Sequence, residues 1–164
     1  MAISVPSKSA QFTDYSASPK VMAKPGDWGS KLRASYCKLT FTAAGFTTAS
    51  AGDIGLIRMP AGKVRLLVDL CRIICPIGTA TSDLDIGWAA HTNQAGAAVA
   101  ANEDGLAASL DVGAAAIDQS LPLPTGGHQE FDSRDGFDIV CSFDTANSPA
   151  AGDLELSLVY MMGN

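Results

Sequence analysis

The run Leu-Glu-Leu-Ser-Leu-Val-Tyr-Met at residues 154–161 places a large apolar side chain at every second position. Alternate side chains of an extended strand share a face. The expected inward residues are Leu154, Leu156, Leu158 and Tyr160, and the expected outward residues are Glu155, Ser157 and Val159. This alternation predicts a β-strand with one buried and one exposed face.

The same alternation recurs upstream, at residues 36–42, 81–88 and 137–143. The inward residues expected in these runs are Cys37, Leu39, Phe41, Leu84, Ile86, Trp88, Phe137, Ile139, Cys141 and Phe143. The outward residues expected in the last two runs are Asp83, Asp85, Gly87, Asp138, Val140 and Ser142. Residues 53–59 and 63–75 are also strand-like, and the second run is long enough to bend or to cross between sheets.

The period is lost between residues 89 and 110. Residues 103–110 begin with Glu103 and Asp104, and acidic groups favour the first turn of a helix, so we expect one or two helical turns there. The chain has no long amphipathic helix pattern. Short strands separated by turn residues predict an all-β fold, a jelly-roll-like antiparallel β-sandwich.

Charge divides the chain into two parts. Residues 1–35 hold five basic and two acidic side chains, a net charge of +3, whereas residues 36–164 hold six basic and fifteen acidic ones, a net charge of −9. The first part is rich in Ser, Pro and Gly and buries too little apolar surface to fold alone. We therefore expect an extended basic N-terminal arm over residues 1–35 and a β-sandwich domain over residues 36–164.

Composition limits the partners. The acidic domain argues against nucleic acid as a partner, because duplex binding needs a concentrated basic face. The longest apolar run, residues 64–77, is interrupted by charges and too short to cross a bilayer, and residues 1–10 lack the apolar segment of a secretory signal. We expect a soluble protein, made in the cytoplasm, with no nucleic-acid or membrane partner.

Charged residues make up 17% of the chain, below the usual fraction of about 25%. Ala and Gly are concentrated in residues 87–116. Two interpretations remain open: partner subunits cover part of this small-residue surface, or the protein is simply a loop-rich β protein with small turn residues.

Cysteine and histidine form no recognisable catalytic or metal motif. Cys71 and Cys75 are not spaced as zinc ligands, and on a strand they lie too far apart to form a disulfide. All four cysteines are expected as buried free thiols. His91 and His128 lack a nucleophile motif such as G-x-S-x-G, so both are expected to be structural or exposed. We expect no catalytic residue and no enzymatic activity.

Several carboxylates are paired in the sequence. Asp83 and Asp85 would share the outward face of a strand, where they are expected as solvated acids that protect the surface from edge pairing. Residues 132–136, Asp-Ser-Arg-Asp-Gly, resemble part of a calcium loop but lack its full spacing and closing Glu, so a turn is expected. No metal and no cofactor is predicted.

Four stretches resemble a known family: residues 52–62 (GDIGLIRMPAG), 81–87 (TSDLDIG), 102–113 (NEDGLAASLDVG) and 151–158 (AGDLELSL). Their order is similar to that of the head-decoration, or cement, proteins of tailed bacteriophages. The similarity covers about residues 52–159 and leaves out the arm.

The resemblance implies a β-sandwich on the exterior of a virion capsid, commonly a homotrimer that stabilises the head by binding over major capsid protein subunits. The basic arm would reach a neighbouring subunit or the capsid protein. The arm residues expected to contact a partner are Phe12, Tyr15, Lys20, Lys24, Trp28, Lys31 and Arg33.

Other functions remain open. An arm of this length also suits a tail, collar or portal-proximal component. A carbohydrate-binding or host-adhesion module is a competing function, because jelly rolls readily carry sugar sites, although the chain has only 7% aromatic residues. A scaffold protein unconnected with any virus is a third.

Overall fold

The computed structural model describes residues 32–41, 54–76, 83–122, 127–143 and 151–163. Most of these residues are in β-strands. The elements are β1 (Leu32–Phe41), β2 (Ile54–Met59), β3 (Gly62–Leu66), the short 3-10 helix η1 (Val68–Leu70), β4 (Arg72–Cys75), β5 (Asp83–Trp88), β6 (His91–Thr92), β7 (Ala98–Val99), β8 (Asn102–Asp111), β9 (Ile117–Ser120), β10 (Gln129–Ser133), β11 (Phe137–Phe143) and β12 (Gly152–Gly163).

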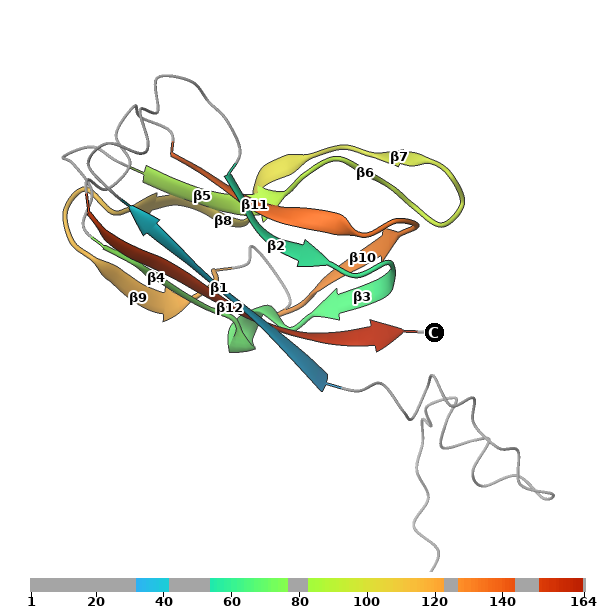
Figure 1. Ribbon diagram of the computed structural model, residues 1–164, viewed down its shortest axis with the longest axis horizontal. Helices are drawn as coiled ribbons and strands as arrows, with labels where there is room; N and C mark the ends of the chain where they lie inside the picture. The colour runs from blue at the N-terminus through green and yellow to red at the C-terminus, as the bar shows by residue number, and fades with distance from the viewer. Residues whose placement is uncertain (1–31, 42–53, 77–82, 123–126, 144–150, 164) are drawn as a thin grey trace, which may run out of the picture.

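Ten of the twelve described strands form two packed antiparallel sheets, and β6 and β7 pair separately as a two-stranded hairpin (Figure 1). One sheet has the order β2-β11-β5-β8. In the other, β12 pairs with β1 along one side and with β3 and β4 in succession along the other, and β10 and β9 lie outside β3 and β4. We call the first the β5 sheet and the second the β12 sheet.

The pairing is that of one long hairpin wound into a roll. β1 pairs with β12, β2 with β11, β3 and β4 with β10 and β9, and β5 with β8, so successively inner segments of the chain pair with each other. The hairpin of β6 and β7 is the innermost pair and ends in a turn at residues 93–97. This nested arrangement is a jelly roll, which confirms the fold predicted from the alternating segments.

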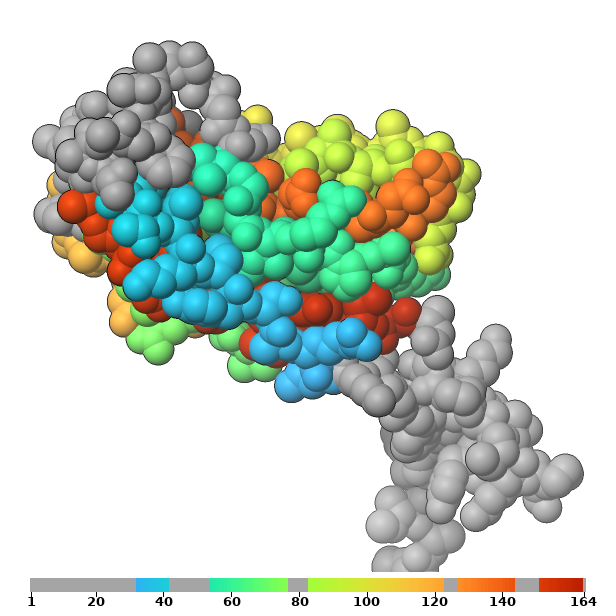
Figure 2. All heavy atoms as spheres, in the orientation of Figure 1, coloured from blue at the N-terminus to red at the C-terminus, as the bar shows by residue number. Residues whose placement is uncertain are grey.

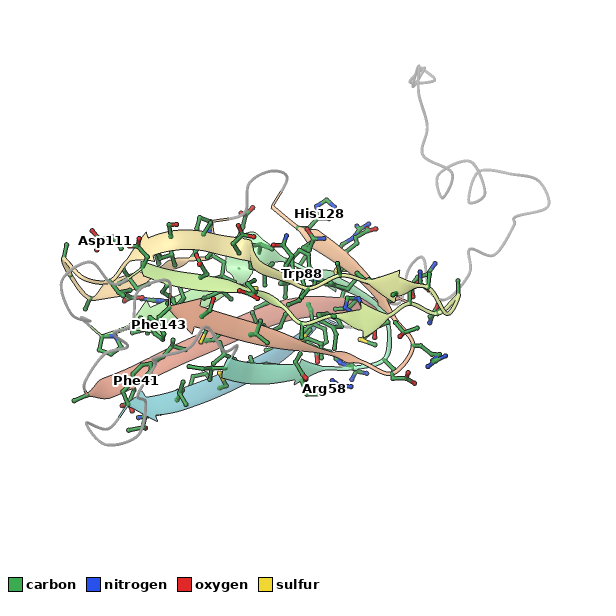
Figure 3. All side chains as sticks on the ribbon, turned by 90° about the horizontal axis from the view of Figure 1, so that it is seen from above. Phe41, Arg58, Trp88, Asp111, His128 and Phe143 are labelled. Atoms are coloured by element: carbon green, nitrogen blue, oxygen red, sulfur yellow. The ribbon has the colours of Figure 1, made fainter. Side chains whose placement is uncertain are left out.

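The core lies between the inner faces of the two sheets. Leu154, Leu156 and Leu158 are fully buried on β12, and Ile139 and Cys141 are fully buried on β11. The inward faces predicted for the runs at 81–88, 137–143 and 154–161 are thus confirmed, with Trp88 only partly buried. At one end of the sandwich, the Phe41 and Phe143 rings pack edge to face across the sheets with centroids 5.8 Å apart (Figure 3).

Residues 63–75 do not form one strand. They bend at η1 and continue as β4 within the same sheet, so the long apolar run bends but does not cross between sheets. The backbone N–H of Leu67 donates to the carbonyl of Val159 at 2.8 Å, which keeps the bend attached to β12.

The helical turns predicted for residues 103–110 are wrong: this segment is strand β8. Its pairing with β5 shifts register twice, and Ser109 has a φ of 49°. These bulges break the period of two, because each extra residue moves the following side chains to the other face. Small residues and acids then leave no alternation to recognise.

The outward, solvated position predicted for Asp85 is also wrong. Only 7% of Asp85 is exposed, and its carboxylate accepts a hydrogen bond of 2.6 Å from the backbone N–H of Ser109. Val140 and Ser142, also expected outward, are 3% and 8% exposed. For Asp85 the cause is the irregular β8, which approaches the outer face of β5 closely enough that a Cβ on Gly87 would lie 1.8 Å from the carbonyl oxygen of Asn102.

Candidate interaction surface

Among the residues that the structure describes, three large apolar side chains are strongly exposed: Leu32 (62%), Tyr36 (58%) and Leu70 (58%). Leu32 and Tyr36 lie on the outward face of β1, and Leu32 is paired with Met161 on β12. Between them, Ala34 is paired with Val159. Figure 2 shows β1 and β12 side by side on the face turned to the viewer.

Leu70 belongs to η1, and η1 adjoins β12 because Leu67 is hydrogen-bonded to Val159. We name the surface formed by Leu32, Ala34, Tyr36, Val159, Met161 and Leu70 the apolar patch. Its members lie on the paired strands β1 and β12 and on η1, which follows the hydrogen bond from Leu67 to Val159 of β12. Contiguous exposed apolar surface with a polar border is typical of protein–protein contacts.

Charged pairs border the apolar patch on the same sheet. Lys38 Nζ lies 2.7 Å from Asp153 Oδ2, and the Thr40 hydroxyl donates to the other oxygen of the same carboxylate at 2.7 Å. Hydrogen bonding to Lys38 and then to Thr40 holds the pKa of Asp153 below its usual value. This border keeps its charge at neutral pH.

Arg72 and Asp118 form a two-pronged pair across β4 and β9, with both N–O distances at 2.6 Å. The Arg72 hydrogen bond lowers the pKa of Asp118. Arg65 and Glu130 form a similar pair across β3 and β10, and the Arg65 hydrogen bond lowers the pKa of Glu130. Cations and carboxylates thus neutralise each other across the β12 sheet, and the apolar patch stands out from this polar surface.

Tyr36 joins the patch to its charged border. Partial burial, followed by a hydrogen bond to the Glu155 carboxylate, raises the pKa of the Tyr36 phenol. The phenol therefore stays protonated at neutral pH and offers an apolar ring with a polar tip, a combination common at protein interfaces.

The arm residues predicted to contact a partner are mostly outside the described residues. These are Phe12, Tyr15, Lys20, Lys24, Trp28 and Lys31. Arg33 is described: it is exposed on β1 and paired with Tyr160, so it lies on the opposite face of the strand from Leu32 and Tyr36 of the apolar patch. Strand β1 begins at Leu32, so Leu32–Ser35, which we assigned to the arm, belong to the sheet.

The four cysteines are free thiols, as predicted. Cys71, Cys75 and Cys141 are buried, whereas Cys37 is only partly buried. Burial raises the pKa of Cys71 to about 11 and that of Cys75 to about 12. Since the thiolate is the reactive form, neither thiol is suited to nucleophilic chemistry at neutral pH.

The histidines have the positions predicted for them. His91 stacks on Phe137 with ring centroids 5.0 Å apart, and its Nδ1 lies 3.1 Å from the carbonyl oxygen of Ala89. His128 is exposed at the start of β10.

Acidic side chains gather at a second place, a polar hollow of about 400 Å³ lined by Asp85, Glu103 and Asp104 among others. No group of three or more His, Cys, Asp or Glu side chains in the described part of the chain is arranged to hold a metal ion. The turn predicted over residues 132–136 is confirmed only for residues 134–136, which join β10 to β11 with Gly136 at a φ of 83°, because Asp132 and Ser133 are the last residues of β10.

None of the described helices is long and apolar enough to span a bilayer.

Comparison with known proteins gives little. No protein-family model matches the chain, and no curated protein matches it. A solved structure entitled "Cyanophage Pam1 capsid asymmetric unit" contains a chain that superposes with a TM-score of 0.46 at 14% sequence identity, over 96% of this chain and 99% of that one. A likeness this distant assigns no function to the chain.

Proposed function

We propose that this protein is a structural component of a phage virion, which decorates the exterior of the capsid as an oligomer. Two sequence features support the proposal: the family resemblance of residues 52–159 and the basic arm that precedes an acidic domain. The jelly roll is compatible with it but does not select it, because one fold serves many functions.

The apolar patch is the observation that carries the proposal. Two leucines and a tyrosine more than half exposed, on a sheet where Lys38, Arg65 and Arg72 are each paired with a carboxylate, are unfavourable in water unless another surface covers them. The patch lies at the start of β1, so the arm enters the domain beside it. A contact at the patch would place the arm of one copy close to the next copy.

In the proposed assembly the patch is buried between copies, in a homotrimer as the family resemblance implies, and the arm binds the major capsid protein. The arm through Lys31 has four lysines against two aspartates, so it is attracted to an acidic surface. The mechanism is passive: an oligomer that contacts several capsid subunits holds them against outward displacement.

The magnitude follows from the exposure. Complete burial of a leucine stabilises by about 1.5–3 kcal/mol, so covering Leu32 and Leu70, each about 60% exposed, contributes about 1–2 kcal/mol apiece. The double variant Leu32→Ser with Leu70→Ser should therefore weaken association more than tenfold. Stability of the single subunit should hardly change, because both side chains already face water.

Light scattering over a range of concentrations tests this. The unmodified protein should have the mass of an oligomer. On dilution, the double variant should dissociate at a concentration more than tenfold higher than the one at which the unmodified oligomer dissociates. Gln94→Ser with Ala114→Ser, two exposed changes away from the patch, should leave the mass unchanged. If the unmodified protein is a monomer at all concentrations, or if it and the Leu32→Ser, Leu70→Ser variant have equal masses throughout, the patch is excluded as the contact between copies.

A further inference from the structure

A pocket of about 200 Å³ lies between the hairpin of β6 and β7 and strand β10 (Figure 1). Its lining consists of Trp88, His91, Asn93 and Val99 on the hairpin side and of residues 129–132 on β10. Pockets for drug-sized ligands are usually about 300–1,000 Å³. This pocket therefore accommodates no more than one small ring.

Alternation along β10 decides which of its side chains face the inside of the pocket. The Trp88 ring meets Phe131 edge to face with centroids 5.0 Å apart, so the face of β10 that carries Phe131 is turned toward Trp88. Gln129 lies two residues before Phe131 and shares this face. Glu130 and Asp132 alternate with them, so their carboxylates point to the opposite face. The inside wall formed by β10 is thus neutral.

The aromatic part of the wall is held in place by packing. Phe131 packs on Phe137 with centroids 4.4 Å apart, and the His91 ring stacks on Phe137 at 5.0 Å. Gly105 lies so close to the Trp88 indole that a Cβ there would be 2.2 Å from a ring carbon. Trp88 nevertheless remains partly exposed. The pocket therefore has an apolar ring that is fixed in position and accessible.

Three neutral polar side chains complete the lining, each oriented by a hydrogen bond to the backbone. His91 Nδ1 lies 3.1 Å from the carbonyl oxygen of Ala89, which can only accept, so Nε2 of the neutral ring is left as an acceptor. The N–H of Ala97 donates to the Asn93 carboxamide oxygen at 2.8 Å, which turns the two amide donors of Asn93 the other way. Gln129 Nε2 donates to the next backbone carbonyl at 3.2 Å, which leaves its oxygen as an acceptor.

This combination of groups limits the chemistry of a ligand. A cation would be attracted by the aromatic rings but would find no carboxylate on the inside wall. An apolar ring would displace water and leave the polar side chains without partners, which is costly. A pyranose ring satisfies both kinds of group, because its hydroxyls donate and accept and its C–H face packs on an aromatic ring.

We propose that the pocket binds one neutral pyranose ring, with Trp88 against its C–H face and with Asn93, His91 and Gln129 bonded to its hydroxyls. Two sources share this chemistry, a free monosaccharide and the terminal residue of a surface glycan. The site is separate from the proposed capsid role, because none of the residues that define the apolar patch is among those that line the pocket.

Nuclear magnetic resonance of the ¹⁵N-labelled full chain tests the proposal with glucose, galactose, mannose and their methyl glycosides. At least one of them should produce saturable shifts of the Trp88 indole N–H and of the Asn93 and Val99 amides, with a Kd in the millimolar range expected of so small a ligand. Tetrahydropyran, which has the ring without the hydroxyls, and glucitol, which has the hydroxyls without the ring, should produce none.

Gln129→Met keeps the length of the side chain but removes its hydrogen bonds, so it should weaken binding about fivefold, the effect of one neutral hydrogen bond. Gln119→Met, the same change at an exposed position of β9 outside the lining, should leave the affinity unchanged. Trp88→Phe keeps a ring of smaller area, so it should weaken binding about threefold or more. Circular dichroism confirms that each variant is folded.

The source is assigned by comparing reducing sugars with methyl glycosides. Equal affinity for both shows that the anomeric oxygen is free to carry a further residue, as at the end of a glycan, and binding of the reducing sugar alone shows a site for free monosaccharides. The proposal is overturned if no sugar gives a saturable response, if tetrahydropyran or glucitol responds equally, if the shifts lie away from the pocket, or if folded Gln129→Met and Trp88→Phe variants bind as tightly as the unmodified protein.

Discussion

Gly87→Ala tests the account of how β5 and β8 meet. Gly87 is buried, and a Cβ at this position would lie 1.8 Å from the carbonyl oxygen of Asn102 and 2.6 Å from the carbonyl carbon of Glu103. Ordinary Cβ contacts begin at 3.4 Å, so the strands would have to separate locally by about 1.6 Å. The obstructing atoms are backbone and cannot rotate away.

Overpacking of a core by one methyl group commonly costs about 1–3 kcal/mol, and more where the surroundings cannot yield. We expect Gly87→Ala to reduce the free energy of unfolding by at least about 3 kcal/mol. For a chain of this length, that loss corresponds to a decrease of about 6–12 °C in the melting temperature. Circular dichroism during thermal and urea denaturation measures both quantities.

Gly55→Ala on β2 is the matched control, because nothing lies within 4 Å of a Cβ there. It should alter stability by less than about 0.5 kcal/mol, or increase it slightly by restricting the unfolded chain. If Gly87→Ala is within 1 kcal/mol of Gly55→Ala, the close approach of β8 to β5 is incorrect.

Three further outcomes are expected. Leu156→Ala, at a fully buried site on β12, should reduce the free energy of unfolding in urea by about 2–5 kcal/mol. Burial raises the pKa of Cys75 to about 12, so this thiol should resist N-ethylmaleimide in the folded protein at pH 8. The partly buried Cys37 should be alkylated first, as peptide mass spectrometry would show. Because the pKa of Asp118 is lowered in the folded protein, its pair with Arg72 stabilises the fold at pH values above the ordinary carboxyl pKa of 3.8, and this contribution is lost as the pH falls through the lowered pKa. The variant Arg72→Gln should raise the pKa of Asp118 toward 3.8, as carboxyl NMR would measure.

The strands predictable from sequence were those with one buried and one exposed face. In β12, every second residue from Leu154 to Tyr160 is apolar and buried, so the pattern contained both the strand and its orientation. β8 was not predictable in this way. Its bulges, the positive φ of Ser109 and the small residues Ala107 and Ala108 remove the period on which a strand prediction depends.

The interaction surface was less accessible to sequence reasoning. Leu32 lies between Lys31 and Arg33, so it was counted with the arm, and Leu70 lies in an apolar run that was interpreted as strand. Which apolar residues remain uncovered depends on strand order, because β1 pairs with β12, more than a hundred residues away in sequence. Asp85 illustrates the same limit: its burial results from the path of β8.

Association with capsid shells is the most direct test of the proposed role. Purified full-length protein is mixed with expanded empty shells of the phage that the proposed function implies as its source. The protein that sediments with the shells is quantified against concentration. The account predicts saturable binding at a fixed number of copies per shell, and weaker binding by the Leu32→Ser, Leu70→Ser variant. If the protein remains in the supernatant and no saturable binding to the shells is found at any concentration, the proposed capsid role is contradicted.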